Sequence, residues 1–229
     1  MDRERPILSD SGHPVCKALA ANGWAVLSTT STTHDSLAAD VLSTAGKLGD
    51  IVPGRGGQIV ELVVPESIHT ARASSLSSKY GLQPLPLHTD TAHWIIPCRF
   101  LVLACLEPGP TPTPTFLLDS FAIRFSERED LLCRSAVFAI RNGRRSFYGS
   151  ILDPERPFVR LDPGCMTPIS RDGVKALESF CTGRHEQSLQ QHDWMQGDIM
   201  VLDNWRMLHG RGRSASTERG RILMRAMIK

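Results

Sequence analysis

The chain has 229 residues, 41% of them apolar, and carries a formal net charge of +2 at neutral pH. That apolar share supports a sizeable core and argues against disorder, while the small net charge gives no reason to expect nucleic acid or a membrane surface as a partner. No apolar run approaches the ~20 residues of a membrane span, and the N-terminus lacks the apolar segment of a secretory signal. We therefore expect a cytoplasmic protein that forms one domain over residues 1–229.

The six cysteines are scattered along the chain without a C-x-x-C pair. Without a secretory signal they are most simply reduced thiols, several of them packed in the core. They are Cys16, Cys98, Cys105, Cys133, Cys165 and Cys181.

Two helices and a short strand are predicted in the N-terminal part. Residues 11–21 have helical spacing and end at Asn22-Gly23, which is a good helix stop. Residues 24–27 are typical of a strand. Residues 35–48 then place their apolar side chains on one helical face and end before Gly49.

Residues 51–57 are rich in glycine and could suggest a phosphate-binding loop. The stretch lacks the Gly-Lys-Ser/Thr ending and a following helix, so we interpret it as a turn before a strand at residues 58–64. The serine-rich residues 71–80 have no clear periodicity. We expect them to form a loop over one mouth of a barrel, where substrate-contacting residues are often carried.

The rest of the chain predicts many short strands. Residues 99–106 are apolar on both faces, as in a strand buried between two layers. One helix is expected from a cap at Asp119 or Ser120 to about Cys133, and another at residues 170–182. The other predicted strands are residues 85–89, 115–118, 137–140, 158–161, 199–202, 207–210 and 221–228. This pattern predicts a mainly β fold, a double-sheet jelly roll with α decoration.

Three residues predict a metal site. Side chains of a strand repeat their direction every second residue, so His88 and Asp90 would point the same way. His209, on a later strand, is the candidate third ligand. Two histidines and one carboxylate around open coordination positions are typical of non-haem Fe(II) oxygenases. His185 and His192 compete with His209, but neither lies in a convincing strand.

Arg221 and Arg225 share one side of the last predicted strand. If that side faces water, the two arginines form an ordinary exposed face. If it faces the barrel interior, a buried arginine requires an anion or an acidic partner, and its planar fork suits a carboxylate better than a lysine would.

Several blocks of the sequence together resemble one known family. They are PLHTDTAHWIIPCRFLVLACLEPG with TPTFLLD, then GDIMVLDNWRMLHGR, and last RGRILMRAMI. They resemble the TauD/TfdA superfamily of Fe(II)/2-oxoglutarate dioxygenases, and most of all the branch that holds clavaminate synthase and the amino-acid β-hydroxylases. The blocks cover roughly the C-terminal two-thirds of the chain, and their combination is specific.

The resemblance implies a double-stranded β-helix fold of the cupin-like type. It implies that His88, Asp90 and His209 are the iron ligands, and that Arg221 pairs with the distal carboxylate of 2-oxoglutarate with help from the Thr115 hydroxyl. The implied cofactor is Fe(II), with 2-oxoglutarate and O₂ as cosubstrates. In related halogenases a small residue replaces this carboxylate, so Asp90 favours hydroxylation or another oxidation of a C–H bond.

Two other residues near these motifs, Arg225 and Trp94, have two interpretations each. Arg225 could face a substrate that bears a carboxylate, or it could form a structural ion pair. Trp94 could wall the substrate pocket or simply belong to the core. Asn204 is expected to shape a turn, and the Cys98 and Cys105 side chains are expected to be small apolar fillers.

The leading hypothesis is an oxygenase that hydroxylates, desaturates or cyclises an amino acid or a similar small metabolite, releasing succinate and CO₂. The alternative is a non-catalytic jelly-roll protein that binds a small carboxylate. We expect a small-molecule partner, no nucleic acid and no membrane, and leave a homo-oligomer open. The chain is shorter than typical members, so residues 116–208 leave little room for a large lid.

Overall fold

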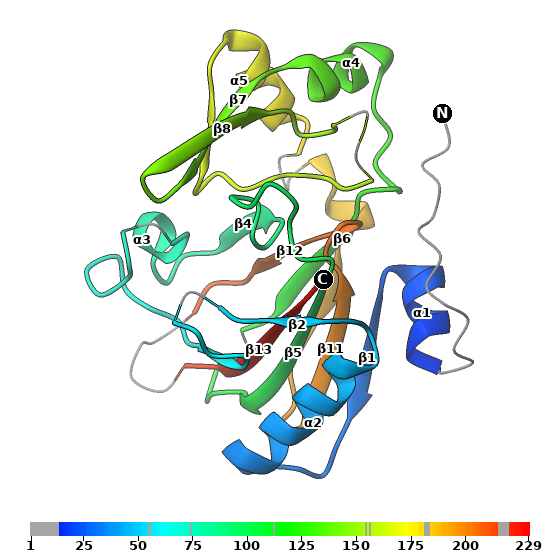
Figure 1. The fold of residues 1–229 in the computed structure, drawn as a ribbon, viewed down its shortest axis with the longest axis vertical. Coiled ribbons are helices and arrows are strands. Elements are labelled where there is room, and N and C mark those ends of the chain that lie inside the picture. Colours follow the sequence, from blue (N-terminus) through cyan, green and yellow to red (C-terminus); the bar gives the residue numbers. More distant parts are fainter. Residues whose placement is uncertain are drawn as a thin grey trace.

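The structure is a computed structural model that describes residues 14–54, 56–73, 75–111, 113–153, 155, 157–180, 184–214 and 220–229. Two antiparallel sheets form its centre (Figure 1). The larger sheet has the order β1 (Trp24–Ser28), β11 (Asp198–Asp203), β5 (Phe100–Glu107), β13 (Ile222–Ile228) and β2 (Ile51–Val52), and β3 (Glu61–Val63) also pairs with β13. The smaller sheet has the order β10 (Gln190–His192), β6 (Thr115–Asp119), β12 (Met207–Arg211) and β4 (Leu85–His88). Two facing antiparallel sheets are the predicted jelly-roll core.

The central strand β5 explains why the two sheets come together. Its odd-numbered side chains, such as Leu101 and Leu103, lie in a buried cluster with Leu117 of β6 and Met207 of β12. Its even-numbered side chains face the opposite way. Both faces of β5 are therefore covered, as its unbroken apolar sequence predicts.

The two N-terminal helices cover the outer face of the larger sheet (Figure 1). Helix α1 (Pro14–Asn22) ends at Gly23, whose φ of +79° suits glycine. Helix α2 (His34–Gly46) begins after Thr33, whose side chain accepts a hydrogen bond from the Ser36 amide. Residues 11–13 of the first predicted helix lie outside the described part of the chain.

A segment between β6 and β10 folds into a separate layer, which we call the inserted lobe (residues 120–180). It contains α4 (Glu127–Ser135), β7 (Phe138–Asn142), β8 (Arg145–Gly149), β9 (Met166–Pro168) and α5 (Arg171–Glu178). The three strands form their own antiparallel sheet in the order β8, β7, β9.

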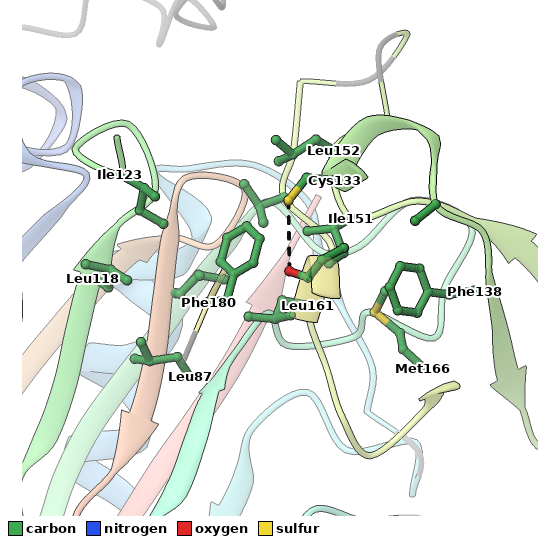
Figure 2. Close-up of a cluster of buried hydrophobic side chains, with 14 of the residues drawn as sticks. Leu87, Leu118, Ile123, Cys133, Phe138, Ile151, Leu152, Leu161, Met166 and Phe180 are labelled. Carbon is green, nitrogen blue, oxygen red and sulfur yellow. Dashed lines mark hydrogen bonds between the residues drawn. The ribbon is translucent and has the colours of Figure 1, made fainter. Parts of the chain in front are cut away.

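The inserted lobe packs on the outer face of the smaller sheet. Leu87 of β4 and Leu118 of β6 join Phe138, Ile151 and Leu161 of the lobe in one buried cluster (Figure 2). The residues between Thr115 and His209, expected to leave little room for a lid, thus form a layer behind the strands that carry the predicted metal ligands.

Several predicted elements differ from the structure. The helix expected from Asp119 begins at Glu127, because Ser126 and Glu129 form a reciprocal capping box there. Residues 158–161 are not a strand and make only an isolated bridge, between Val159 and Leu152. The predicted strand 58–64 is confined to β3, and the predicted loop at residues 71–80 contains the short helix α3 (Ser77–Tyr80).

No pattern predicts β8, β9 or β10, and residues 51–52, predicted as part of a turn, form β2. A 3₁₀ turn, η2 (Glu186–Ser188), precedes β10. Thr182 of the second predicted helix and Cys181 lie outside the described residues. Among the residues described, no helix combines the length and the apolar character that crossing a membrane requires.

Candidate active site

Two neighbouring strands of the smaller sheet, and the turn that follows one of them, bring three side chains together. His88 ends β4 and lies directly opposite His209 of β12 in the strand register. The Nε2 atoms of His88 and His209 lie 3.3 and 3.8 Å from Oδ1 of Asp90. One nitrogen or oxygen atom of each residue falls within 4.8 Å of the others. The set offers two imidazoles and one carboxylate to a single ion.

Asp90 does not extend the strand as predicted. Strand β4 ends at His88, and Asp90 lies in a turn beyond it. The side chain of Asn204 holds this turn, since its Oδ1 accepts from the Asp90 amide at 2.9 Å and its Nδ2 donates to the Asp90 carbonyl at 3.0 Å. The next residue, Thr91, has a φ of +56°, which is strained for a β-branched residue. The turn, rather than strand alternation, aims the carboxylate at the histidines.

Charge and burial at the cluster favour an ionised Asp90 carboxylate beside a neutral His209 imidazole. Burial alone would raise the pKa of Asp90, but Arg225, His88 and His209 together hold this pKa well below its ordinary value. Burial lowers the pKa of His209 to about 3, with His88 contributing next. Burial also opposes the charged form of His88, but its hydrogen bond and attraction to Asp90 raise its pKa overall. A carboxylate and neutral imidazole nitrogens are the forms that bind a divalent metal.

Hydrogen bonds on the far side of His88 and Asp90 also orient these two side chains for metal binding. Nδ1 of His88 lies 3.0 Å from the Pro86 carbonyl, which directs its Nε2 toward the cluster. Oδ2 of Asp90 accepts from Arg225 at 2.8 Å, which leaves Oδ1 facing the histidines.

Arg225 forms an ion pair with two carboxylates. Its second nitrogen donates to Oε2 of Glu61 at 2.7 Å, while the first binds Asp90. Burial opposes the charge on Arg225, but the two carboxylates raise its pKa above the ordinary value. Its Nε is buried with no hydrogen-bond partner among the described residues. Of the two interpretations of Arg225, substrate contact or structural ion pair, the structure contains the ion pair.

Arg221 lies in a different electrostatic setting. It precedes β13 by one residue, is only 5% exposed, and faces the barrel interior rather than water. Its Nη1 donates to the Thr113 carbonyl at 2.5 Å and to the Thr115 hydroxyl at 3.1 Å. Its guanidinium also lies over the ring of Trp194, with 5.7 Å between the guanidinium carbon and the ring centroid. Within the described part of the chain, no carboxylate lies at ion-pair distance from Arg221.

This setting fits a bound carboxylate. Burial lowers the pKa of Arg221 to about 10, and the nearby cation Arg211 contributes next, so the guanidinium is charged at neutral pH. Thr115 accepts from both Arg221 and Nε1 of Trp194, which leaves its own hydroxyl hydrogen to donate to a ligand. A buried cation with neutral partners and a spare hydroxyl donor is what a dicarboxylate such as 2-oxoglutarate requires at its far end.

Several other candidates lie away from the cluster or have structural contacts. His192 pairs with Asp198 at 3.2 Å, and Nε2 of His185 lies 2.8 Å from the Ser179 carbonyl. Trp94 follows the Asp90 turn and packs partly against the interior cluster, with the Lys229 ammonium 5.6 Å from its ring centroid.

Cys98 and Cys105 are fully buried in the interior apolar cluster, and burial raises the pKa of each thiol to about 12. Both are the apolar fillers that were expected.

Three residues at the site escaped sequence reasoning. Glu61 pairs with Arg225, Trp194 binds Thr115, and Arg160 binds the turn that follows Asp90. Each comes from a segment without a recognisable motif. The one available signal was alternation in residues 58–64, which indicates a strand but gives no role for Glu61.

One family model matches part of the chain. Residues 123–227 match the sequence model of the taurine catabolism dioxygenase TauD, TfdA family. This stretch contains His209, Arg221 and Arg225, while His88 and Asp90 precede it. No curated protein matches the chain in sequence.

Solved structures share the fold. A structure of asparagine oxygenase with Fe(II), hydroxyasparagine and succinate has a TM-score of 0.72 at 19% identity, over 90% of this chain and 74% of that one. The non-haem iron oxygenase OrfP with Fe and alpha-ketoglutaric acid has a TM-score of 0.70 at 18% identity, over 93% of this chain and 77% of that one. At these identities the likeness establishes the fold.

A jelly roll with two histidines and one carboxylate at one end, beside a buried arginine, defines the class of non-haem iron oxygenases. The family match is more specific. Residues 123–227, slightly under half of the chain, resemble the TauD/TfdA family of dioxygenases, and the solved structures of iron oxygenases share the fold.

Proposed function

We propose that this enzyme oxidises an unactivated C–H bond of an amino acid or a similar small metabolite, at an iron held by His88, Asp90 and His209. The observation that carries the proposal is the convergence of these three side chains beside a buried guanidinium that has no carboxylate partner in the described chain. Bound iron, with 2-oxoglutarate and O₂, supplies the oxidising power, and succinate and CO₂ are the coproducts. The protein contributes geometry and the exclusion of water.

In this proposal Arg221 and Thr115 hold the distal carboxylate of 2-oxoglutarate. The guanidinium offers charge and a planar fork, and the threonine hydroxyl offers one further donor. The ring of Trp194 covers the guanidinium from one side and keeps Thr115 in place. These residues bind and orient the cosubstrate.

The substrate side of the proposal rests on Arg225, Glu61 and Trp94. An amino acid carries one carboxylate and one ammonium group, and Arg225 and Glu61 offer one complementary charge for each. Arg225 also retains an unused buried Nε–H donor. Trp94, on the turn after Asp90, supplies an apolar wall. Two of the solved neighbours, asparagine oxygenase with hydroxyasparagine and OrfP with (3S)-hydroxy-L-Arg, contain amino-acid products, which supports this substrate class.

The proposal includes a single domain in a reducing cytoplasm. The described cysteines are thiols rather than disulfides, as a reducing compartment would keep them.

A substrate screen tests the proposal. The protein, Fe(II), 2-oxoglutarate and a panel of amino acids are incubated in air, and products are read by mass spectrometry. We expect succinate together with a substrate that gains one oxygen or loses two hydrogens, and neither change with His88→Ala. Binding of 2-oxoglutarate without O₂ consumption across the panel would instead indicate a carboxylate-binding protein without catalysis.

A further inference from the structure

Residues 159–161 of the inserted lobe run along the back of the metal-binding motif. The Thr89 amide, between His88 and Asp90, donates to the Leu161 carbonyl at 2.6 Å. The Thr89 hydroxyl donates to the Val159 carbonyl at 2.8 Å and accepts from the Leu161 amide at 3.3 Å. Three hydrogen bonds thus fix the residue that separates two of the three proposed ligands.

The side chain between these contacts reaches the turn beyond Asp90. Arg160 is only 4% exposed. Its Nη1 donates to the carbonyls of Ala92 and Trp94, the latter at 2.6 Å, and its Nη2 donates to the Ile95 carbonyl at 2.8 Å. One guanidinium therefore binds three carbonyls within four consecutive residues through two nitrogen atoms in a fixed plane, a geometry that the single nitrogen of a lysine does not have.

The position of this guanidinium is itself fixed. Its carbon lies 5.0 Å from the ring centroid of Phe147 in β8 and 5.0 Å from that of Phe158. Leu161, the next residue, is anchored in the lobe's buried cluster (Figure 2).

The turn after Asp90 is held from both sides. Asn204, in the turn between β11 and β12, binds both backbone groups of Asp90. Arg160, in the inserted lobe, binds backbone carbonyls within residues 92–95. Thr91 lies between these contacts with its strained φ of +56°. A strained residue keeps such a conformation only where its surroundings over-determine it.

We infer that Arg160 is a positioning residue of the active site: by binding the carbonyls of residues 92, 94 and 95 it keeps the strained turn closed and the Asp90 carboxylate aimed at the metal. Through Arg160 the inserted lobe sets the affinity of the site for iron. This inference rests on the proposed metal site. Arg160 touches neither metal nor substrate, so it acts only through the turn.

The test compares Arg160→Met with Arg206→Met in the full chain. Arg206 is a matched control, because its guanidinium also binds two backbone carbonyls, those of Ala20 and Ala21, and pairs with Asp119. We expect both variants to lower the melting temperature. Only Arg160→Met should weaken Fe(II) binding in anaerobic titrations, by about 10–100-fold, as for other outer contacts of metal ligands. Arg160→Lys, which retains the charge and part of the hydrogen bonding, should recover part of that loss.

Amide hydrogen exchange in the metal-free protein gives a second readout. Residues 92–98 should exchange faster in Arg160→Met than in wild type, and at the wild-type rate in Arg206→Met. Fe(II) affinity and exchange in Arg160→Met that equal those of the control would overturn the inference.

Two outcomes need separate treatment. If Arg160→Met does not fold, Phe147→Leu takes its place. This variant removes one of the two rings beside the Arg160 guanidinium and should weaken iron binding about threefold. Wild-type affinity for iron in both Phe147→Leu and Arg160→Lys would overturn the inference. If the wild-type protein itself fails to bind Fe(II), the proposed function fails, and the exchange comparison still decides whether Arg160 holds the turn.

Discussion

Arg221 directly precedes β13 and Arg225 lies within it, and both side chains face the barrel interior, yet their surroundings differ. Arg225 binds the carboxylates of Asp90 and Glu61 at 2.8 and 2.7 Å. Arg221 binds a carbonyl and the Thr115 hydroxyl, with no described carboxylate within ion-pair distance.

The difference separates a charge that the protein itself balances, at Arg225, from a charge that no described carboxylate balances, at Arg221. A buried cation is stable only when an anion accompanies it. The protein supplies that anion for Arg225, whereas for Arg221 we expect the cosubstrate to supply it. Two arginines that face the same interior thus perform two tasks, and the acidic neighbours decide which.

The largest effect is expected from a substitution that removes the Asp90 carboxylate, which binds Arg225 and is a proposed metal ligand. Asp90→Ala should lower Fe(II)-dependent succinate formation by more than about 100-fold, beyond the range of outer-contact variants, because a proposed ligand is lost. The measurement is succinate released per enzyme at saturating 2-oxoglutarate. Asp193→Ala is the control: it removes a carboxylate that accepts a hydrogen bond from the exposed Gln191 side chain, and it should keep wild-type turnover. Retained turnover in Asp90→Ala would show that the iron binds elsewhere.

The next effect separates the two arginines by cosubstrate affinity. Arg221→Met should raise the KM for 2-oxoglutarate by about 10–100-fold, since hydrogen bonds to a charged group contribute roughly 1.5–3 kcal/mol. Arg221→Lys should fall between Arg221→Met and wild type, because it keeps the charge without the fork. An unchanged KM for Arg221→Met in steady-state assays would remove the distinction between the two arginines.

The two substitutions should differ in their effect on the stability of the metal-free protein: Arg225→Met should lower it and Arg221→Met should not. Breaking a buried ion pair costs about 3–5 kcal/mol, and partial exposure of Arg225 reduces this to about 2 kcal/mol for Arg225→Met. Arg221→Met removes a buried cation that lacks a carboxylate, so its free energy of unfolding should stay level or rise. Urea denaturation measures both. Equal losses in the two variants would contradict the comparison.

The smallest effect concerns the hydroxyl beside Arg221. Thr115→Val keeps the shape and removes one neutral hydrogen-bonding group, which contributes about 1 kcal/mol. We expect the KM for 2-oxoglutarate to rise about fivefold with little change in kcat. Thr113→Val is the matched control, because Arg221 binds the Thr113 backbone carbonyl, which the substitution leaves in place. A similar rise in that control would attribute the effect to packing.

The strands of the barrel centre were predictable because their side chains are buried on both faces. Strands β5, β11 and β12 fall within one or two residues of their predicted bounds. By contrast, β8 and β10 escaped prediction because their side chains are polar or largely exposed, and they pair with β7 and β6 through backbone hydrogen bonds that leave no apolar pattern.

The residues of the candidate site also differ in how far the sequence predicts them. His88, His209 and Arg221 were predictable from motifs, and the fold brings their segments together. Arg160 and Glu61 could not be predicted, because their roles depend on long-range contacts between segments without a motif. Asp90 does not follow the side-chain alternation of a strand that was predicted. Strand β4 ends at His88, and a turn held by Asn204 orients the Asp90 carboxylate instead.

The most direct test of the account is an anaerobic titration of the protein with 2-oxoglutarate in the presence and absence of Fe(II), followed by visible absorption. We predict a charge-transfer band that requires iron and 2-oxoglutarate together, saturates at one equivalent, and disappears in His209→Ala. A band of undiminished strength in His209→Ala, or tightly bound iron in the wild type with no band on adding 2-oxoglutarate, would contradict it.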